Sequence, residues 1–329
     1  MLVPMALEAM ATRFELVVCG AREPMLRRAG ARALEEVEIA DRQLSRFRRD
    51  SVVAFLEREA MLRPVRVLPE IFELLLLCKE AHRQSGGAFD ISIGARMEEL
   101  GFHETVNREA DEQCMKDSPQ SRRGARTRRE SNRPGEARGL EALELREESC
   151  EVVLHGRIKL DLGGVGKGYA IDRAVEVLRE EGVRSAFLHG GTSSVFALGA
   201  PPGQAAWKVG LRNPSGADVE ICLEDRALSV SSTHGRRRWI DGELKSHVID
   251  PRDGSPLGGE CVAAVVHPTA ARAEVWSTAL LVLGPDFVVP DPQATSLYLS
   301  AQSRMALHGA EQRLFRTRQA PFAGAITGK

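Results

Sequence analysis

The sequence predicts an α+β fold in which helices pack in layers on a mixed, mostly antiparallel sheet. Two long stretches with helical spacing of apolar residues precede residue 90, and short apolar runs dominate after residue 150. The runs and helices do not alternate in the strict order that a parallel sheet requires. A chain of 329 residues that is 43% hydrophobic can bury one large core or two modest ones.

The first half contains one predicted strand and two predicted helices. The segment "TRFELVVCG" alternates and predicts a strand over Phe14–Cys19. The next segment spaces its apolar residues by three and four, which predicts an amphipathic helix ending near Phe47. Its apolar positions are Leu26, Ala29, Ala33, Val37, Ala40 and Leu44. A second helix is expected from Pro69, which suits a first turn, to the stop at Gly86-Gly87.

The second half is predicted to be rich in strands. "CEVVLHG" and "RIKLDLGG" have the pattern of a hairpin, followed by a helix over Tyr169–Glu181. Six further runs indicate strands: "SAFLHGG", "SSVFALG", "WKVGLRNP", "RALSVSS", "SHVIDP" and "CVAAVVHP". A last helix is expected from about Ala270 to Leu283, before Gly284-Pro285.

A basic segment separates the two halves. Residues 104–139 lack apolar periodicity, and "DSPQSRRGARTRRESNRPGEARG" contains seven arginines. Such a segment cannot bury enough apolar area to offset its ordering entropy, so a disordered surface insertion is expected. Contact with RNA or an acidic partner stays an alternative, although no aromatic residues stand between the arginines to stack on bases.

The whole-chain composition excludes several classes. A net charge of -1 gives no global reason to expect nucleic acid or an anionic membrane as partner. The six cysteines form no C-x-x-C pair, which argues against zinc and favours reduced thiols. The N-terminus has no basic region before an apolar run, and no apolar run reaches 18 residues. We therefore expect a cytoplasmic protein without a membrane segment.

The stretch "LDLGGVGKGYAIDR", residues 160–173, combines an acid, four glycines and a lysine. It fails the P-loop pattern, because Asp161 stands where the first glycine is needed and Gly168 where a hydroxyl is needed. It also fails the G-x-G-x-x-G pattern, because its last position is Tyr169. Glycines before a helix still allow backbone N–H groups to approach an anion, and Lys167 adds charge. A tight turn with a surface lysine is the equally weighted alternative.

Two later segments carry further polar groups. "KSHVIDPRDGSPL" places His247 and Asp250 on a predicted strand that ends at Pro251. In "ARAEVWSTALLVLG", Glu274 and Thr278 are four residues apart and share one helix face, with Ser277 beside them. A carboxylate and a hydroxyl are hard oxygen ligands of the kind that Mg²⁺ prefers. The alternative for Glu274 is an acid favoured by the helix dipole.

Five motifs in this order resemble the FAD:protein FMN transferases, the ApbE flavin transferase family. They are "MAT" at Met10, "GAFDISIG" at Gly87, "LDLGGVGKGYAIDR", "SHVIDPRDGSP" and "AEVWSTALLVLG". The resemblance implies a T-fold-like layered sandwich. It also implies one domain over residues 10–290, interrupted by the insertion 104–139, which residues 291–329 complete with a C-terminal strand and tail.

The resemblance also implies roles for individual residues. FAD contacts are expected at Met10, Phe47, Ala88, Phe89, Asp90, Asp161, Lys167 and Val248. Magnesium is expected on the carbonyl of Gly164 and on Glu274 and Thr278, with Ser277 at an intervening position that is often acidic. The chain departs from the family where Glu274 replaces an aspartate, Thr192 an aspartate and Glu57 an asparagine. These changes bear on metal binding and activity, and the basic insertion is atypical.

The implied reaction transfers FMN from FAD to a Ser or Thr hydroxyl of a separate flavoprotein with a D-x-x-(S/G)-A-T motif, releasing AMP. His247 or Asp250 is expected to accept the hydroxyl proton, and His247 is preferred because a histidine pKa ordinarily lies near neutrality. One alternative is an FAD pyrophosphatase that gives FMN and AMP, and another is a flavin-binding protein with impaired catalysis. A fourth reading assigns RNA or partner binding to the arginine-rich insertion.

Overall fold

The computed structural model describes residues 1–102, 139–216, 218–235, 237–240 and 242–317. The predicted insertion 104–139 lies outside these residues except for Gly139, which begins a short 3₁₀ helix, η1 (Gly139–Ala142). The domain boundaries at 10, 290 and 291 stay a prediction. Within the described residues no helix is long and apolar enough to cross a membrane.

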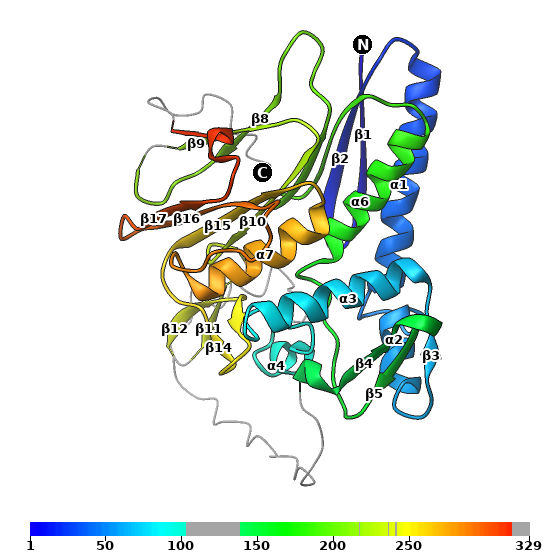
Figure 1. The fold of residues 1–329 in the computed structure, drawn as a ribbon, viewed down its shortest axis with the longest axis vertical. Helices are drawn as coiled ribbons and strands as arrows, with labels where there is room; N and C mark the ends of the chain where they lie inside the picture. Colours follow the sequence, from blue (N-terminus) through cyan, green and yellow to red (C-terminus); the bar gives the residue numbers. More distant parts are fainter. Residues whose placement is uncertain (103–138, 217, 236, 241, 318–329) are drawn as a thin grey trace, which may run out of the picture.

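An eight-stranded sheet forms the centre of the molecule (Figure 1). Its order is β1-β2-β6-β7-β10-β15-β16-β17, and each neighbouring pair is antiparallel. The bounds are β1 Leu2–Ala9, β2 Thr12–Cys19, β6 Ser185–Gly190, β7 Ser194–Leu198, β10 Arg226–Ser232, β15 Cys261–His267, β16 Thr295–Ser300 and β17 Met305–His308. The predicted α+β class with a mostly antiparallel sheet is therefore confirmed.

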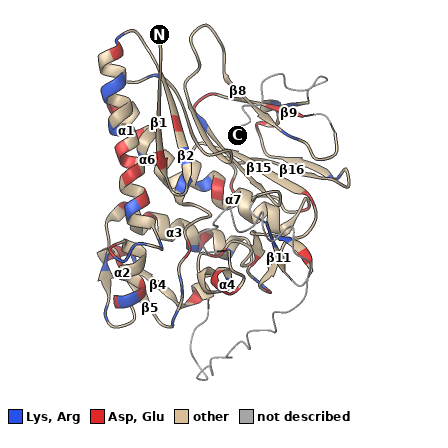
Figure 2. Ribbon diagram, turned by 180° about the vertical axis from the view of Figure 1, so that it is seen from behind, with Lys and Arg blue, Asp and Glu red and all other residues tan. Residues whose placement is uncertain are grey.

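Different layers cover the two faces of the sheet. The helices α1 (Glu23–Leu44), α6 (Gly166–Glu180) and α7 (Ala270–Leu283) pack on one face, as Figure 1 shows. The other face carries a small sheet of order β18-β9-β8, with bounds Phe315–Thr317, Val219–Leu223 and Trp207–Leu211. Successive side chains of β7 point to opposite faces of the sheet. Phe196 packs in the core on the helix side, whereas Val195 and Ala197 pack in the core on the other side. Figure 2 shows mixed acidic and basic residues along α1, as an exposed helix face requires.

A second group of elements packs below α7. It contains the helices α2 (Val52–Glu59), α3 (Pro69–Gln84) and α4 (Gly94–Glu99). A three-stranded sheet of order β3-β5-β4 accompanies them, with bounds Val65–Arg66, Glu151–Leu154 and Leu143–Arg146. Two hairpins follow β10: β11 (Arg237–Ile240) with β12 (Glu243–Ser246), and β13 (Ile249–Asp250) with β14 (Ser255–Pro256). Short 3₁₀ turns lie at η2 (Glu147–Ser149) and η3 (Gln312–Leu314). One apolar core joins α2, α3 and α7.

Three local predictions are wrong. "RIKLDLGG" forms no hairpin with β5, which pairs instead with β3 and β4. Its backbone bonds to distant residues: Gly94 N–H donates to the carbonyl of Lys159, and Asp161 N–H to that of Ile91. The helix expected from Tyr169 begins at Gly166, so Lys167 lies in its first turn. "SHVIDP" is not one strand: Ser246 ends β12, Ile249–Asp250 form β13, and His247 lies between the two hairpins.

Candidate active site

The helices α6 and α7 cap one another. At the start of α6, the N–H of Gly168 donates to Glu274 Oε2 of α7 at 2.8 Å. At the start of α7, the N–H groups of Ala270 and Ala271 donate to the carboxylate of Asp172 of α6, at 2.7 and 2.9 Å. Each carboxylate thus satisfies backbone donors that a helix N-terminus leaves unpaired. The two N-termini are fixed against one another.

Close approach of the two helices requires glycine at position 168. A Cβ there would lie 2.5 Å from the carbonyl oxygen of Ala270 and 2.7 Å from the nitrogen of Ala271. Both atoms belong to the backbone of α7 and cannot rotate away. The glycine therefore permits the contact on which the capping depends.

Glu274 is a buried carboxylate with three donors. It is 3% exposed, and its Oε1 accepts from the hydroxyl of Ser194 in β7. The ammonium of Lys167 lies 3.3 Å from the same oxygen. The structure thus brings two predicted site residues, Lys167 and Glu274, into an ion pair. Ser194 was not predicted.

Asp172 is the second carboxylate of this crossing and is partly buried. Burial raises its pKa to about 7, opposed by the two backbone N–H donors and reinforced by the charge of Glu274. Asp172 was not predicted as a site residue. Its position four residues after Gly168, on the same helix face, could have indicated it.

Gly164 and Thr278 meet beside this crossing, together with Phe89. A Cβ on Gly164 would lie 3.9 Å from Thr278 Oγ1 and 3.5 Å from Phe89 Cε2. Thr278 is half-buried, whereas Ser277 is fully buried. The hydroxyl of Ser277 bonds to those of Ser229 and Ser231 in β10, each at 2.9 Å. Of the two neighbouring hydroxyls, Thr278 is the one that faces the glycine loop.

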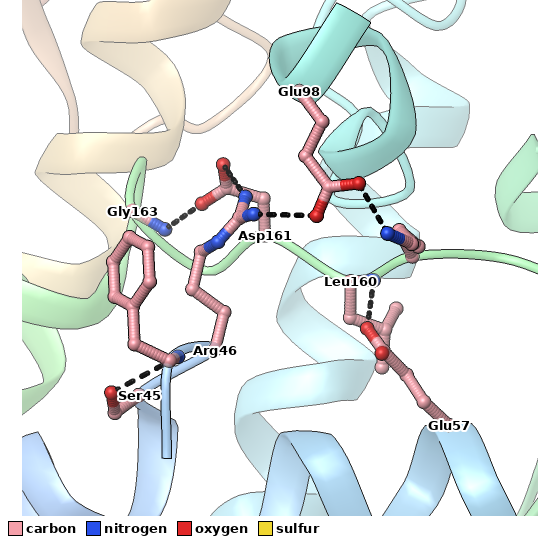
Figure 3. A network of polar contacts seen from close by, with 9 residues as sticks. Ser45, Arg46, Glu57, Glu98, Leu160, Asp161 and Gly163 are labelled. Atoms are coloured by element: carbon pink, nitrogen blue, oxygen red, sulfur yellow. Dashed lines mark hydrogen bonds and ion pairs between the residues drawn. The ribbon is translucent and has the colours of Figure 1, made fainter. Parts of the chain in front are cut away.

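Arg46, which follows α1, and residues of α2 and α4 surround the start of the glycine loop (Figure 3). Arg46 Nη1 donates to Asp161 Oδ2 at 3.3 Å, and Arg46 Nη2 to Glu98 at 3.0 Å. Asp161 Oδ1 accepts from the N–H of Gly163 at 2.8 Å. Asp161 is thus fixed from both sides. Arg46 was not singled out from the sequence, although it directly precedes Phe47 in "LSRF".

Glu57 holds the same loop one residue earlier. Its Oε1 accepts from the N–H of Leu160 at 2.7 Å (Figure 3). Burial raises the pKa of Glu57, opposed by the hydrogen bond from Leu160 and by the charges of Lys159 and Arg46. The residue noted as a departure from the family is therefore a structural contact of the glycine loop.

A basic cavity of about 290 Å³ opens beside these residues. Phe47 lines it with 68% of its surface exposed, and the guanidinium of Arg46 lies 5.1 Å from the centre of the Phe47 ring. The other lining residues are Arg48, Arg49, Ala54, Glu57 and Arg58. An exposed aromatic ring among guanidinium groups can receive a flat, anionic ligand.

The segment Ala88–Phe89–Asp90 follows α3 and lies under the glycine loop. Ala88 and Phe89 are buried. Asp90 Oδ1 accepts from the N–H and the hydroxyl of Ser92, both at 2.6 Å, and its Oδ2 lies 3.5 Å from His82 Nδ1. Phe89 is thus fixed where it touches Gly164.

Met10 lies in the turn between β1 and β2. Met10 and Ala11 have φ angles of 50° and 56°, a left-handed backbone that costs free energy in residues other than glycine. The N–H of Met10 donates to Asp41 of α1 at 3.1 Å. The turn also touches the glycine pair before β7, since a Cβ on Gly191 would lie 2.5 Å from Thr12 Oγ1.

His247 lies between the two hairpins, and Asp250 ends β13 of the second hairpin. A Cβ on Gly235 would lie 2.7 Å from His247 Cε1. Gly235 is four residues after Ser231, whose hydroxyl is 3.4 Å from Thr278 Oγ1. Four extended residues span at most about 14 Å, which limits how far Gly235 can lie from Ser231. Val248 is half-buried against the core beneath.

Asp250 forms a bidentate ion pair with Arg252. The distances are 2.9 Å from Nε to Oδ1 and 2.6 Å from Nη2 to Oδ2. The hydrogen bonds from Arg252 hold the pKa of Asp250 below its usual range, although partial burial opposes this. Such a carboxylate is a poor proton acceptor at neutral pH.

The donor chemistry beside Thr278 is oxygen only. Among the described residues, no three His, Cys, Asp or Glu side chains form a metal-binding group. The oxygen donors are instead the carboxylate of Glu274, the hydroxyl of Thr278 and the backbone of Gly164. This mixture of hard oxygen groups fits Mg²⁺ in kind.

Solved structures define the class of fold. The crystal structure of an ApbE protein from Thermotoga maritima matches with a TM-score of 0.77 and 24% identity, over 96% of this chain and 100% of that chain. The flavin transferase ApbE from Vibrio cholerae, also solved as a histidine-to-glycine mutant, matches with a TM-score of 0.73 and 18% identity. That match covers 96% of this chain and 99% of the Vibrio chain. The fold is thus that of the ApbE flavin transferases.

Sequence comparison shows the family. The model of the ApbE family matches residues 10–289, and the chain belongs to this family. A Klebsiella pneumoniae protein named FAD:protein FMN transferase is 30% identical, over 72% of this chain and 70% of its own. An Escherichia coli protein of the same name is 26% identical, over 76% of this chain and 70% of its own. The resemblance drawn from the five motifs is confirmed.

Proposed function

We propose that the protein transfers FMN from FAD to a Ser or Thr hydroxyl of an acceptor flavoprotein and releases AMP. One observation carries the proposal: the glycine loop and α7, more than 100 residues apart in the chain, meet at Gly164 and Thr278. Beside that contact lie a lysine and a buried carboxylate. The shared name of the curated relatives, FAD:protein FMN transferase, supports the same activity.

Glu274, Thr278 and the carbonyl of Gly164 would hold Mg²⁺. Bound there, the ion would neutralise charge on the diphosphate oxygens of FAD. Glu274 is the carboxylate of this set, and its contact with Lys167 at 3.3 Å holds the side chain in place. The longer side chain than the family's aspartate reaches the N-terminus of α6, where Gly168 fixes one of its oxygens.

The chain's own groups bind and orient FAD. Lys167 and the N-terminus of α6 would face the diphosphate, with Asp161, held by Arg46, shaping the loop. Phe47 in the basic cavity and Met10 at the strained turn would flank the flavin. Ala88, Phe89 and Asp90 would support the loop from below, and Val248 would close the opposite side.

The transfer forms one bond and breaks one. The acceptor hydroxyl oxygen bonds to the FMN phosphorus, and the bond from that phosphorus to the bridging oxygen breaks, so AMP leaves with the electron pair. His247 would accept the hydroxyl proton. Asp250 is the weaker candidate, because Arg252 holds its pKa low.

The test combines FAD, Mg²⁺ and a purified acceptor that carries the D-x-x-(S/G)-A-T motif. Mass spectrometry should show the acceptor gaining FMN less one water, with release of AMP, and a chelator should stop the gain. Free FMN and AMP without acceptor modification would instead identify an FAD pyrophosphatase. Tight FAD binding without either product would identify a flavin-binding protein with impaired catalysis.

The same assay separates the two proton acceptors. His247→Gln should lower the rate of transfer by about 10²–10⁴-fold, the usual contribution of general base catalysis. Asp250→Asn should lower it far less. Equal losses in both variants would contradict the assignment.

A further inference from the structure

The hairpin of β11 and β12, which we call the Trp239 hairpin (Arg237–Ile240 and Glu243–Ser246), exposes two large apolar side chains. Trp239 is 66% exposed and Leu244 is 46% exposed. They are direct cross-strand partners, so their side chains lie on the same face of the hairpin. Arg237 and Ser246 form the next pair but one on that face. The face therefore presents a tryptophan and a leucine beside an arginine.

The opposite face of the hairpin is anchored. The guanidinium of Arg238, which lies on that face, donates to the carbonyl of Gly101 at the end of α4. At the base, Nε of Arg237 donates to the carbonyl of Thr233 at 3.1 Å, and Ser246 is buried. These contacts fix the orientation of the hairpin and leave the Trp239 face toward solvent.

The base of the hairpin adjoins His247, the proposed proton acceptor. His247 directly follows β12 and touches Gly235, which precedes β11. Ser231, four residues before Gly235, reaches Thr278. A polypeptide on the Trp239 face would therefore have its neighbouring residues within a few residues' length of the proposed base and metal ligands.

The charge of the segment selects among polypeptides. On the Trp239 face the basic residue is Arg237, which is exposed, whereas Arg238 and Lys245 lie on the opposite face. Glu243 is itself paired with Lys245. Tryptophan and arginine are the residue types that most often dominate the energy of protein interfaces. An exposed arginine beside a tryptophan and a leucine fits a partner segment with acidic and apolar side chains.

We propose that the Trp239 hairpin docks the acceptor protein, by an acidic and apolar segment next to its modified Ser or Thr. The proposal rests on the proposed transferase function, since it names where the second substrate of that reaction binds. The basic cavity proposed for FAD is lined by α2 and by the segment between α1 and α2, whereas the hairpin belongs to the segment after β10.

The test compares the native protein with the double variant Trp239→Ala, Leu244→Ala. Truncating a dominant interface residue commonly weakens binding by about 30-fold or more. We therefore expect the KM for a purified acceptor with the D-x-x-(S/G)-A-T motif to rise by at least that factor, while the KM for FAD stays within about twofold. Trp239→Phe should recover most of the loss, because it restores an aromatic ring. Met305→Ala is the matched control, since Met305 is 56% exposed on β17.

A second measurement is independent of catalysis. Binding of the same acceptor is titrated without FAD by the tryptophan fluorescence of the native protein and by calorimetry for the variants. Weaker binding by the double variant supports the docking surface, even if native protein transfers no FMN and the proposed function fails. Unchanged acceptor KM and binding, a parallel rise in the KM for FAD, or no acceptor binding by native protein would overturn it.

Discussion

The crossing of α6 and α7 predicts that glycine-to-alanine substitutions at positions 168 and 166 have different effects on the free energy of unfolding. Gly168→Ala places a methyl group 2.5 Å from the carbonyl oxygen of Ala270. Gly166→Ala, in the same helical turn, places it 3.7 Å from Leu44 Cδ1, an ordinary contact. Both glycines are buried in α6.

The expected magnitudes follow from these contacts. Overpacking against backbone costs about 1–3 kcal/mol. Separation of the helices would also weaken the hydrogen bonds from Ala270 and Ala271 to Asp172, and bonds to charged groups contribute about 1.5–3 kcal/mol. Gly168→Ala should therefore lower the free energy of unfolding by at least about 2 kcal/mol. Gly166→Ala should leave it unchanged or raise it by up to about 1 kcal/mol, because alanine restricts the unfolded chain.

Thermal unfolding followed by circular dichroism measures the difference. For a chain of this size the Tm changes by about 2–4 °C per kcal/mol, so Gly168→Ala should lower it by at least about 4 °C. FMN transfer should fall in the same variant, since Glu274 loses its partner Gly168. The reasoning is refuted if Gly168→Ala is as stable as Gly166→Ala.

Three further predictions concern the buried carboxylates. Glu274→Gln should lower the free energy of unfolding by about 1–3 kcal/mol, because Lys167 and Ser194 lose a charged acceptor; urea unfolding measures it, and native-like stability would contradict it. Asp172 has a pKa raised to about 7, above the unfolded value of 3.8. The free energy of unfolding should therefore fall as pH rises from about 4 to 7, and this group contributes at most about 1.4 kcal/mol per pH unit. Melting curves of Asp172→Asn should lack that component, and parallel pH profiles would exclude it. Glu57→Ala removes the acceptor of the Leu160 N–H and should cost about 1–2 kcal/mol in the stability of the glycine loop. The KM for FAD should therefore rise about tenfold. The control Glu59→Ala, on the same helix, should leave the KM for FAD unchanged.

Sequence reasoning succeeded where the signal was local. The helix α7 begins and ends as predicted, because Gly284 terminates it with a φ of 84° and Pro285 follows. The stop of α3 at Gly86-Gly87 was predicted for the same reason, and both glycines have positive φ. The proximity of Glu274 and Thr278 could also be predicted, because a spacing of four residues places both side chains on one face of a helix.

The failures involve partners that are distant in the chain. "RIKLDLGG" alternates like a strand, yet its backbone bonds to Ile91, Glu57 and Gly94, and its pattern carries no record of them. The edge strand β1 was not predicted, and its Pro4 argues against a strand except at an edge. Asp172 and Ser194 act on a helix about 80–100 residues away, so only the fold could show their contacts with Ala270 and Glu274.

The glycine stretch matched neither phosphate motif because its glycines serve different purposes. Gly164 lies where the loop meets Thr278, and a side chain there would have room. Gly168 has no room, because it lies against the backbone of α7. Its N–H is given to Glu274, a protein carboxylate, so it is not available to a ligand. The N–H of Gly166 donates to Leu162 and that of Tyr169 to Val165, so in the proposed site anion recognition would be left to Lys167, while Gly168 joins the two helices that bring Gly164 and Thr278 together. Helix packing therefore requires the glycine at position 168, and Gly168→Ala should impair the proposed site without touching the substrate.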